Sequence, residues 1–384
     1  MRAKLSELGT VITGNTPSKQ ESKYWASSDI PFIKPDVINQ DGITELQAAN
    51  EYISEIARSK ARIVEKSVVL VTCIGSIGKI CLTGRECAFN QQINAIIPND
   101  KVLPEYLAYC IYYNRPRLIE LANAPVVPII NKRQFENFSV NIEENIGQQG
   151  SIVTILKAVD RLIYYRHKQL QKLDELVKAR FVELFGTIHD NRFGFSVVTL
   201  QDVSAPIKDG THQTPTYTTD VENGYKFLSS KDVTAGKVDW SHLKYIPEEL
   251  HRELYTRISP RKGDILLAKN GTTGIAAIVD RDEVFDIYVS LALIRPLGVD
   301  PTYLWAAINA AETKQQFDAS LKGIGVPNLH LGEIKKTRII LPPMELQEQF
   351  AAFVEQTDKS KVAVQKALDE AQLLFDSLMQ KYFE

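Results

Sequence analysis

The sequence has little that would place the chain in a membrane or in an oxidising compartment. It contains no run of 18 apolar residues, and its N-terminal residues do not form a signal peptide, so we expect a cytoplasmic protein. Only four cysteines occur among 384 residues, and no two form a CxxC pair. We therefore expect Cys73, Cys81, Cys87 and Cys110 to be buried free thiols rather than disulfide or metal-binding residues.

Motifs of catalysis are missing as well. The patterns HExxH, GxSxG, GxGxxG and Asn-Pro-Pro-Tyr do not occur, and the six histidines are too scattered to assemble a metal-ligand cluster. Pro35-Asp36 could start a nuclease pattern, but no Glu-x-Lys follows it, so we interpret Asp36 as a structural turn residue. The formal net charge of −2 means that any positive surface for nucleic acid must be local rather than global.

The most regular stretch of the sequence covers residues 151–185. Apolar residues recur seven positions apart at Leu156, Ile163, Leu170, Val177 and Leu184. This spacing predicts one apolar stripe along a helix of about 35 residues, roughly 50 Å long. Gly186 is suited to end that helix. Because an isolated helix of this length could not bury its stripe, we expect a partner helix in the same chain.

A second long helix is predicted at the C-terminus. Residues 344–384 contain neither proline nor glycine, and Pro342-Pro343 before them gives a stop-and-start signal. The apolar stripe of this helix is weaker than the first, because Thr357 and Lys361 interrupt it. Two stripes of equal length can pack together, and the order globule, helix, globule, helix requires the two helices to run antiparallel.

The chain contains one unit twice. Gly75-Ser76-Ile77-Gly78 returns 196 positions later as Gly271-Thr272-Thr273-Gly274, in each case after a strand-like apolar run. The long helices match at an offset of 198, where Asp160, Lys168, Leu170 and Phe185 correspond to Asp358, Lys366, Leu368 and Phe383. The order of the matched features never changes, which indicates a tandem duplication with its boundary near residue 190.

Each copy opens with short β-branched and aromatic runs that Gly, Asn, Asp and Pro separate, which is typical of strands joined by turns. Strands are predicted at 30–33, 68–73, 94–97, 225–228, 264–268 and 288–295. The fold class that follows is α+β: two pseudo-twofold-related, mixed α/β globular domains separated by an antiparallel coiled coil of two long helices. We place the first globule at 1–145, the first long helix at 146–186, a linker at 187–197, the second globule at 198–342 and the second long helix at 343–384.

With both copies in view, the chain resembles the specificity (S) subunit of type I restriction-modification enzymes. The stretches that carry the resemblance are LDELVKARFVELFG at 173–186, LPPMELQ at 341–347 and GVPNLH at 325–330, together with the paired strand–GxxG elements. The resemblance covers essentially all 384 residues. The first copy departs from the family pattern at 140–145, where VNIEEN replaces a Leu-Pro-Pro turn, and this affects the expected start of the first long helix.

The resemblance implies that the globules are target recognition domains, each of which reads one half of a split sequence in double-stranded DNA. The helices would set the spacer between the halves and dock two methyltransferase (modification) subunits, through which restriction subunits join indirectly. Chemistry would belong to these partners, which bring S-adenosylmethionine and ATP with magnesium. The resemblance therefore implies no catalytic residue, metal or cofactor in this chain.

The GxxG turns keep two interpretations open. In one, the tight glycine turn brings backbone N–H groups and the hydroxyls of Ser76, Thr272 and Thr273 to DNA phosphates, with Lys79 and Lys269 adding charge. In the other, the turn is an ordinary glycine hairpin that the fold needs in both copies. A lone GxxG is a weak signal, and neither copy is a P-loop, because the Gly-Lys-Ser/Thr ending is absent.

Base readout requires polar side chains on loops that differ between the copies, because two half-sites usually differ in sequence. The candidates in the first copy are Asn15, Thr16, Ser18, Lys19, Asn90, Gln91 and Gln92. The candidates in the second copy are Lys208, Thr211, His212, Gln213, Ser229, Ser230, Lys231, Lys269 and Asn270. Each one taken singly could be a solvated loop residue.

The alternative function is a non-catalytic coiled-coil adaptor whose globules bind proteins.

Overall fold

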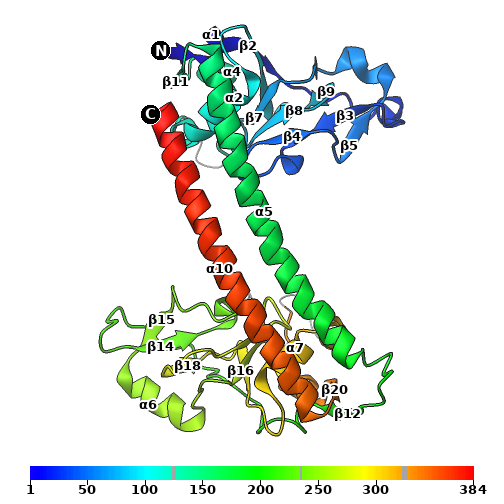
Figure 1. Cartoon of the computed structure of the whole chain (residues 1–384), viewed down its shortest axis with the longest axis vertical. Coiled ribbons are helices and arrows are strands. Elements are labelled where there is room, and N and C mark those ends of the chain that lie inside the picture. The colour runs from blue at the N-terminus through cyan, green and yellow to red at the C-terminus, as the bar shows by residue number, and fades with distance from the viewer. Residues whose placement is uncertain (123–126, 234–235, 322–326) are drawn as a thin grey trace. The chain divides into compact units, whose positions relative to one another are not determined.

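The computed structural model of the chain describes residues 1–122, 127–233, 236–321 and 327–384 (Figure 1). These residues pack as two compact units, one formed by residues 1–168 with 365–384 and the other by residues 169–364. Gly325 and Val326 of the predicted GVPNLH motif lie outside the described residues. The four cysteines are buried and free, which confirms the expectation from the sequence.

The first copy is a mixed α/β globule followed by a long helix. Its elements are β1 (Arg2–Lys4), α1 (Leu5–Leu8), β2 (Gly9–Thr13), η1 (Ser22–Trp25), β3 (Ile30–Ile33), η2 (Pro35–Val37), β4 (Thr44–Leu46), β5 (Glu51–Ile53), η3 (Glu55–Lys60), β6 (Ile63–Val64), β7 (Val69–Thr72), β8 (Ile80–Thr83), β9 (Cys87–Phe89), β10 (Ile93–Pro98), α2 (Pro104–Tyr113), α3 (Arg115–Glu120), α4 (Lys132–Glu136), β11 (Ser139–Asn141) and α5 (Ile146–Phe185), where η marks a 3-10 helix. The main sheet has the order β2-β10-β7-β8-β4, a second sheet has the order β5-β3-β9-β6, and β1 pairs with β11. Every residue of β7 and β8 is buried, so these apolar runs form the middle of the core.

The second copy has the same plan. Its elements are β12 (Ser196–Thr199), β13 (Lys208–Asp209), β14 (Tyr225–Leu228), η4 (Ser230–Asp232), β15 (Lys244–Ile246), α6 (Glu248–Arg257), β16 (Ile265–Ala268), β17 (Ala276–Ile278), β18 (Phe285–Ile287), β19 (Leu291–Ile294), α7 (Pro301–Ile308), α8 (Ala311–Ser320), α9 (Leu331–Lys336), β20 (Arg338–Leu341) and α10 (Met344–Phe383). The sheets have the orders β13-β19-β16-β17 and β15-β14-β18, and β12 pairs with β20. The predicted strands 30–33 and 225–228 are β3 and β14, with the same bounds.

Strand pairing shows that the two copies share one topology. In both copies the second sheet contains one parallel pair, β3 with β9 and β14 with β18. In the main sheet, Thr13 lies opposite Asn94 in the first copy, and Asp209 lies opposite Ala292 in the second. We call residues equivalent when they hold the same place in these paired strands. The predicted duplication is therefore confirmed in the order and register of the shared strands, whereas β4 and β6 of the first copy have no counterpart among the described strands of the second.

The two predicted long helices are present, and each contains 40 residues. Within the first unit, the start of α5 packs with the end of α10 through Leu156 and Phe383. Within the second unit, the end of α5 packs with the start of α10 through Phe185 and Phe350. The helices therefore run in opposite directions, as predicted. Gly186 follows α5 with a φ of 70°, the left-handed conformation that ends a helix.

The helix ends and the weak point of the second stripe have clear local causes. Asn145 accepts a hydrogen bond from the Gln148 backbone N–H at 3.0 Å, so an Asn cap begins α5 where the first copy lacks the Leu-Pro-Pro turn. Lys361, which interrupts the stripe of α10, pairs with Asp174 at 2.9 Å and with Asp358 at 3.1 Å within the second unit. Its side chain is 14% exposed, so its charge is compensated inside the helix pair rather than by solvent.

Candidate nucleic-acid interface

The loop after β2 in the first copy is built around a glycine that touches a neighbouring backbone. The Gly14 backbone N–H donates to the Ile93 carbonyl at 3.1 Å, and the Asn15 N–H donates to the Phe89 carbonyl at 3.1 Å. A Cβ on Gly14 would lie 2.2 Å from the Asn90 carbonyl oxygen, so no larger residue fits. This contact places residues 14–20 beside the turn at 90–92.

The structure brings the predicted residues of these two segments together. Thr16 donates its hydroxyl to Oε1 of Gln91 at 2.6 Å. Asn90 is buried, and its amide donates to Oε1 of Gln92 at 2.8 Å. The Asn15 amide is engaged on both sides, since Nδ2 donates to the Lys60 carbonyl and Oδ1 accepts from the Arg62 backbone N–H. Asn15 therefore shapes the loop, whereas Thr16 and Gln91 are exposed.

A cationic cluster lies at the end of the same loop. Glu51 accepts hydrogen bonds from Nζ of Lys19 at 2.6 Å and from Nζ of Lys34 at 2.5 Å. These two ammonium groups, Lys19 first, hold the pKa of Glu51 below its ordinary value. Lys19 also lies over the ring of Trp25, with 3.5 Å between Nζ and the ring centroid. Lys34 and Glu51 were not predicted as site residues, because the pairs join positions far apart in the sequence.

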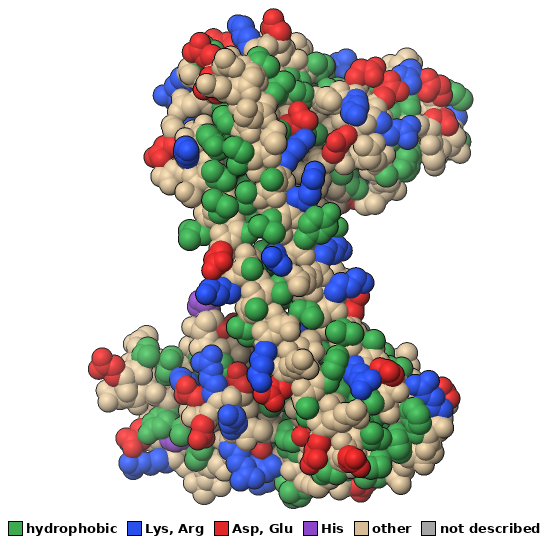
Figure 2. All heavy atoms as spheres, in the orientation of Figure 1, with side chains coloured by type: hydrophobic (Ala, Val, Ile, Leu, Met, Phe, Trp, Pro, Cys, Tyr) green, Lys and Arg blue, Asp and Glu red, His purple; other side chains and the backbone are tan. Residues whose placement is uncertain are grey.

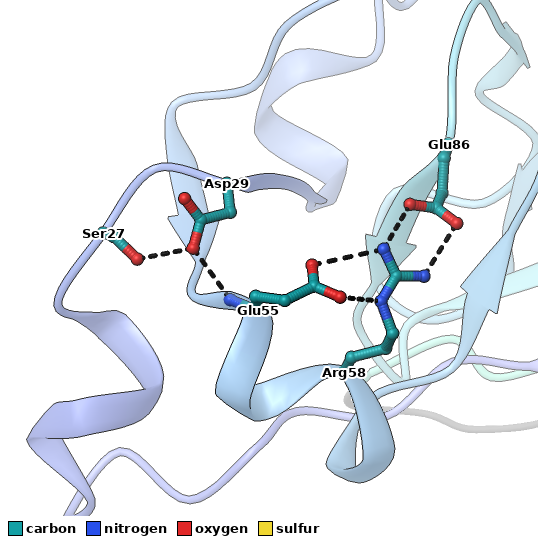
Figure 3. Close-up of polar contacts among 5 residues, drawn as sticks. All are labelled: Ser27, Asp29, Glu55, Arg58 and Glu86. Carbon is teal, nitrogen blue, oxygen red and sulfur yellow. Dashed lines mark hydrogen bonds and ion pairs between the residues drawn. The ribbon is translucent and has the colours of Figure 1, made fainter.

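The segment that supports Asn15 is itself held by a network of charges (Figure 3). Asp29 accepts from the Ser27 hydroxyl at 2.6 Å and from the backbone N–H of Glu55 at 2.8 Å, which caps the start of η3. Arg58 binds both oxygens of Glu86, at 2.7 and 2.8 Å, and also contacts Glu55. Because these carboxylates occupy its guanidinium, Arg58 holds the end of η3 and the adjacent segment 60–62.

The equivalent loop of the second copy has the same glycine contact. A Cβ on Gly210 would lie 1.9 Å from the Ile287 carbonyl oxygen. The Thr211 backbone N–H donates to that carbonyl at 3.1 Å, and the Thr211 carbonyl accepts from Val289 N–H at 3.0 Å. Neither Gly14 nor Gly210 was predicted as a site residue. The signal was available, since the two glycines are 196 positions apart, the same offset as the GxxG glycines.

A buried carboxylate organises the floor of this second loop. Asp209 is 5% exposed and lies 2.9 Å from Nζ of Lys269, 3.2 Å from Nε2 of His212 and 3.5 Å from Arg257. Burial acts to raise the pKa of Asp209, but the pairs with Lys269 and His212 hold it below its ordinary value. Lys269, predicted to add charge at a phosphate site, is 6% exposed and is committed to this internal pair.

The other predicted residues of the second copy surround the same loop. The Ser230 backbone N–H donates to Oγ of Ser290, and the Ser229 hydroxyl donates to Asp232 at 2.9 Å. The Lys208 ammonium group donates to the Arg257 carbonyl at 3.1 Å. The Gln213, Lys231 and His212 residues are exposed.

The GxxG turns lie next to the loops, and their first glycines make the same internal contact in both copies. Gly75 N–H donates to the Pro128 carbonyl at 3.0 Å, and Gly271 N–H donates to the Pro327 carbonyl at 3.2 Å. The structural interpretation of the turn therefore has direct support, because these N–H groups already have partners. Phosphate contact through the exposed hydroxyls of Ser76 and Thr272 stays a prediction, whereas Thr273 is buried.

The remaining predicted residues of the GxxG segments are partly buried. Nζ of Lys79 donates to the Pro35 carbonyl at 3.1 Å. Asn270 forms an isolated antiparallel bridge with Asn328, where the first copy has Ile74 opposite Ile129. Ser18 is exposed, and its carbonyl accepts from Nε1 of Trp25 at 3.1 Å.

On the face of Figure 2, basic and acidic side chains lie interspersed in both units, which agrees with a local rather than a global positive surface.

The fold defines a duplicated protein in which each α/β copy presents one loop cluster of its own and ends in a 40-residue helix. Among the described residues, no helix combines the length and apolarity needed to cross a bilayer. The family profile for the type I restriction modification DNA specificity domain matches residues 1–175 and again residues 194–371. The chain therefore belongs to the type I restriction-modification DNA specificity family.

Individual relatives agree with the family match. The MjaVIII specificity subunit of Methanocaldococcus jannaschii is 24% identical over 364 residues, which cover 88% of this chain and 83% of the relative. Among solved structures, the type I S subunit of M. genitalium aligns with a TM-score of 0.58 at 13% identity, covering 100% of this chain and 96% of that one. A second structure, described as a basis for complex assembly and conformational transition of the type I system, also has a TM-score of 0.58, at 16% identity with 100% and 97% coverage.

Family membership settles the general function. The chain is a DNA sequence-specificity subunit, and it serves recognition rather than catalysis in a type I system. The likeness to solved structures supports the fold, with two α/β domains and two long helices.

Proposed function

We propose that each α/β copy reads one half of a split DNA sequence with its own loop cluster. In the first copy the cluster consists of residues 14–20, 34 and 90–92, and in the second of residues 208–213, 229–231 and 288–290. The observation that carries this proposal is a common backbone frame with different side chains. Thr16 and Gln91 of the first copy are replaced at equivalent places by His212 and Val289. Different side chains in one frame suit two half-sites of different sequence.

The partners and cofactors follow the same proposal. Two methyltransferase subunits bind the chain, restriction subunits join through them, and these partners supply S-adenosylmethionine and ATP with magnesium. A solved structural relative is described in terms of complex assembly of the type I system, which supports the binding of partner subunits. A chain with a net charge of −2 neutralises few phosphates, so its own affinity for DNA should be modest and strongly salt-dependent.

The two long helices are proposed to set the spacer between the half-sites. Inserting three heptads into both α5 and α10 adds about 31 Å, which is about 9 bp or nearly one turn of DNA. The preferred spacer should lengthen by about that amount. The same insertion in α5 alone puts its stripe out of step with α10 and should abolish methylation. An unchanged spacer after the matched insertion contradicts the role of the helices.

The experiment that tests the proposed function is a genome-wide map of methylated adenines in cells that carry this chain and its methyltransferase. A split motif with two unlike halves is the expected result. Exchanging residues 14–20 for the loop of a related chain should then change one half of the motif only. The alternative, a protein-binding adaptor, predicts no split motif, and it would be favoured by a map without one.

A further inference from the structure

A buried carboxylate of the second copy lacks half of its hydrogen-bond partners. Asp286 in β18 is 2% exposed, and its Oδ2 lies 2.7 Å from Nδ1 of His251 in α6, which packs on β18 (Figure 1). Its other oxygen, Oδ1, has no partner among the described residues. A buried acceptor without a partner costs free energy that a native structure normally avoids, so this atom indicates an unaccounted ligand.

The histidine of this pair is held in a fixed orientation. Tyr225 stacks on the His251 ring with 3.7 Å between centroids and 8° between planes, and the Tyr255 ring packs beside it at a tilt of 46°, with 4.9 Å between centroids. Burial raises the pKa of Asp286 to about 6, while the bond to His251 acts in the opposite direction. The carboxyl is therefore ionised at neutral pH, where both of its oxygens can only accept hydrogen bonds.

A small cavity beneath the recognition loop lies beside Asp286. Its lining includes Gly210, Thr211, Arg257 and Asp286, and its volume of about 10 Å³ is at the lower limit for one water molecule. The Thr211 hydroxyl accepts from the Gln213 backbone N–H at 3.2 Å, which leaves its O–H free to donate. A water here would donate to Asp286 and accept from Thr211 or Arg257.

The first copy shows what the cavity replaces. There Asn15, equivalent to Thr211, reaches the Lys60 carbonyl and the Arg62 N–H with its amide. Thr211 is too short for that reach, and the cavity is lined by Thr211 and by Arg257, which ends α6 as Lys60 ends η3. Ala88 stands in the first copy at the place of Asp286. The first copy thus has a long amide and no carboxylate, and the second has a short hydroxyl and a carboxylate.

We propose that one buried water joins Asp286 to Thr211, and that the His251–Asp286 pair positions the loop 211–213 for readout by the second copy. The inference rests on the proposed function, because it assigns the loop a role in reading one half-site. Asp286 and His251 touch no DNA in this scheme and are positioning residues. The water links the loop of the second copy to the residues around it, as the Asn15 amide links the loop of the first copy to Lys60 and Arg62.

The first test is a crystal structure of the full chain at a resolution that shows ordered water. We expect density for a water within hydrogen-bond distance of Oδ1 of Asp286. A filled site supports the bridge, and an empty cavity or a direct protein partner for Oδ1 overturns it. The Thr211→Val variant, which keeps the shape of the side chain but removes its hydroxyl, should lose this water.

The second test separates positioning from general folding. Asp286→Asn and Asp286→Ala are expressed with the methyltransferase, and the methylated motif is mapped. We expect discrimination to fall about tenfold at one half-site, the effect of about one mismatched base pair, while the other half stays sharp. An unchanged motif, or equal loss at both halves, overturns the proposal. If the natural chain gives no split motif, the proposed function has failed before any variant is judged.

The third test uses the first copy as a template. Asp286→Ala combined with Thr211→Asn gives the second copy the two residues that stand at these places in the first. The double variant should regain most of the thermal stability that Asp286→Ala alone loses, because the amide fills the cavity. A double variant no more stable than Asp286→Ala contradicts the equivalence of water and amide.

Discussion

Beneath their recognition loops, the two copies fill equivalent buried positions with side chains of different chemistry. In the first copy, Thr13 donates its hydroxyl to Asn94 at 2.7 Å, and the Asn94 amide donates to Sγ of Cys73 at 3.3 Å. Burial raises the pKa of the Cys73 thiol to about 12, so this layer is neutral. The equivalent residues in the second copy are Asp209, Ala292 and Lys269, where an ion pair replaces the hydrogen bonds.

This difference shows which features the duplication had to preserve. The glycine contact, the strand register and the GxxG turn are backbone features, and they are alike in both copies. Buried polar side chains changed as matched sets, because a single change would leave a buried group without its partner. The exposed loop residues are free of that constraint and can diverge to suit different half-sites.

The largest effect is expected from breaking the buried ion pair of the second copy. Lys269→Met leaves Asp209 buried with only His212 and Arg257 and should cost about 3–5 kcal/mol of unfolding free energy. The triple variant Asp209→Thr, Ala292→Asn, Lys269→Cys installs the neutral set of the first copy and should recover most of that loss. Urea unfolding of the full chain measures both. Equal stability of Lys269→Met and the natural chain would refute the buried-pair interpretation.

A pH-dependent effect is expected from Asp286, which has no charged counterpart in the first copy. Its pKa rises from the ordinary 3.8 to about 6 in the folded chain, so it adds stability below pH 3.8 that is lost as the pH rises through 6. The separation of the two pKa values corresponds to about 3 kcal/mol. Asp286→Asn should remove this dependence. The test is the unfolding free energy of the natural chain and of Asp286→Asn at pH 4 and pH 7. Parallel pH profiles of the two chains would contradict the role of Asp286.

The shared glycines should have similar effects in the two copies. Gly14→Ala and Gly210→Ala each push a Cβ against a backbone carbonyl oxygen, at 2.2 and 1.9 Å, which should cost about 1–3 kcal/mol and disturb the half-site of that copy. Gly332→Ala in α9 is the matched control, since no heavy atom lies within 4 Å of its Cβ, and we expect it to be neutral or slightly stabilising. Thermal unfolding and motif mapping measure the effects. A Gly210→Ala variant with unchanged stability and an unchanged motif would contradict the equivalence of the two glycines.

Much of the fold was predictable because duplication leaves its trace along the sequence. The repeat predicted strands at matching places in both copies and the antiparallel helix pair, and β3 and β14 have the predicted bounds.

The layer beneath the site was not predictable in the same way. Lys34 with Glu51, Asp209 with Lys269 and His251 with Asp286 are partners from different strands and helices. No local sequence pattern predicts such a pair, because each of these charged or polar residues, taken alone, is of a type usually found on the surface. Lys269 illustrates the consequence, since it was chosen as a phosphate contact for its charge and lies instead in the interior.

The smallest effect is expected at the surface, where the copies carry opposite charges at one place. Glu51 of β5 lies opposite Phe32, and Lys244 of β15 lies opposite Phe227, so the two residues are equivalent. Glu51→Gln frees Lys19 and Lys34 from their shared carboxylate, at a cost in stability of under about 0.5 kcal/mol because the group is partly exposed.

Binding to a mixed-sequence duplex should respond more clearly than stability does. With two more ammonium groups available to phosphates, the slope of log K against log salt should steepen by about 1 to 2 in Glu51→Gln. Lys244→Gln, which removes a cation lying 3.9 Å from the Tyr217 ring centroid, is the opposite change and should flatten the slope by less than about 1. Equal slopes in the two variants would mean that this edge of the sheet does not meet DNA in either copy.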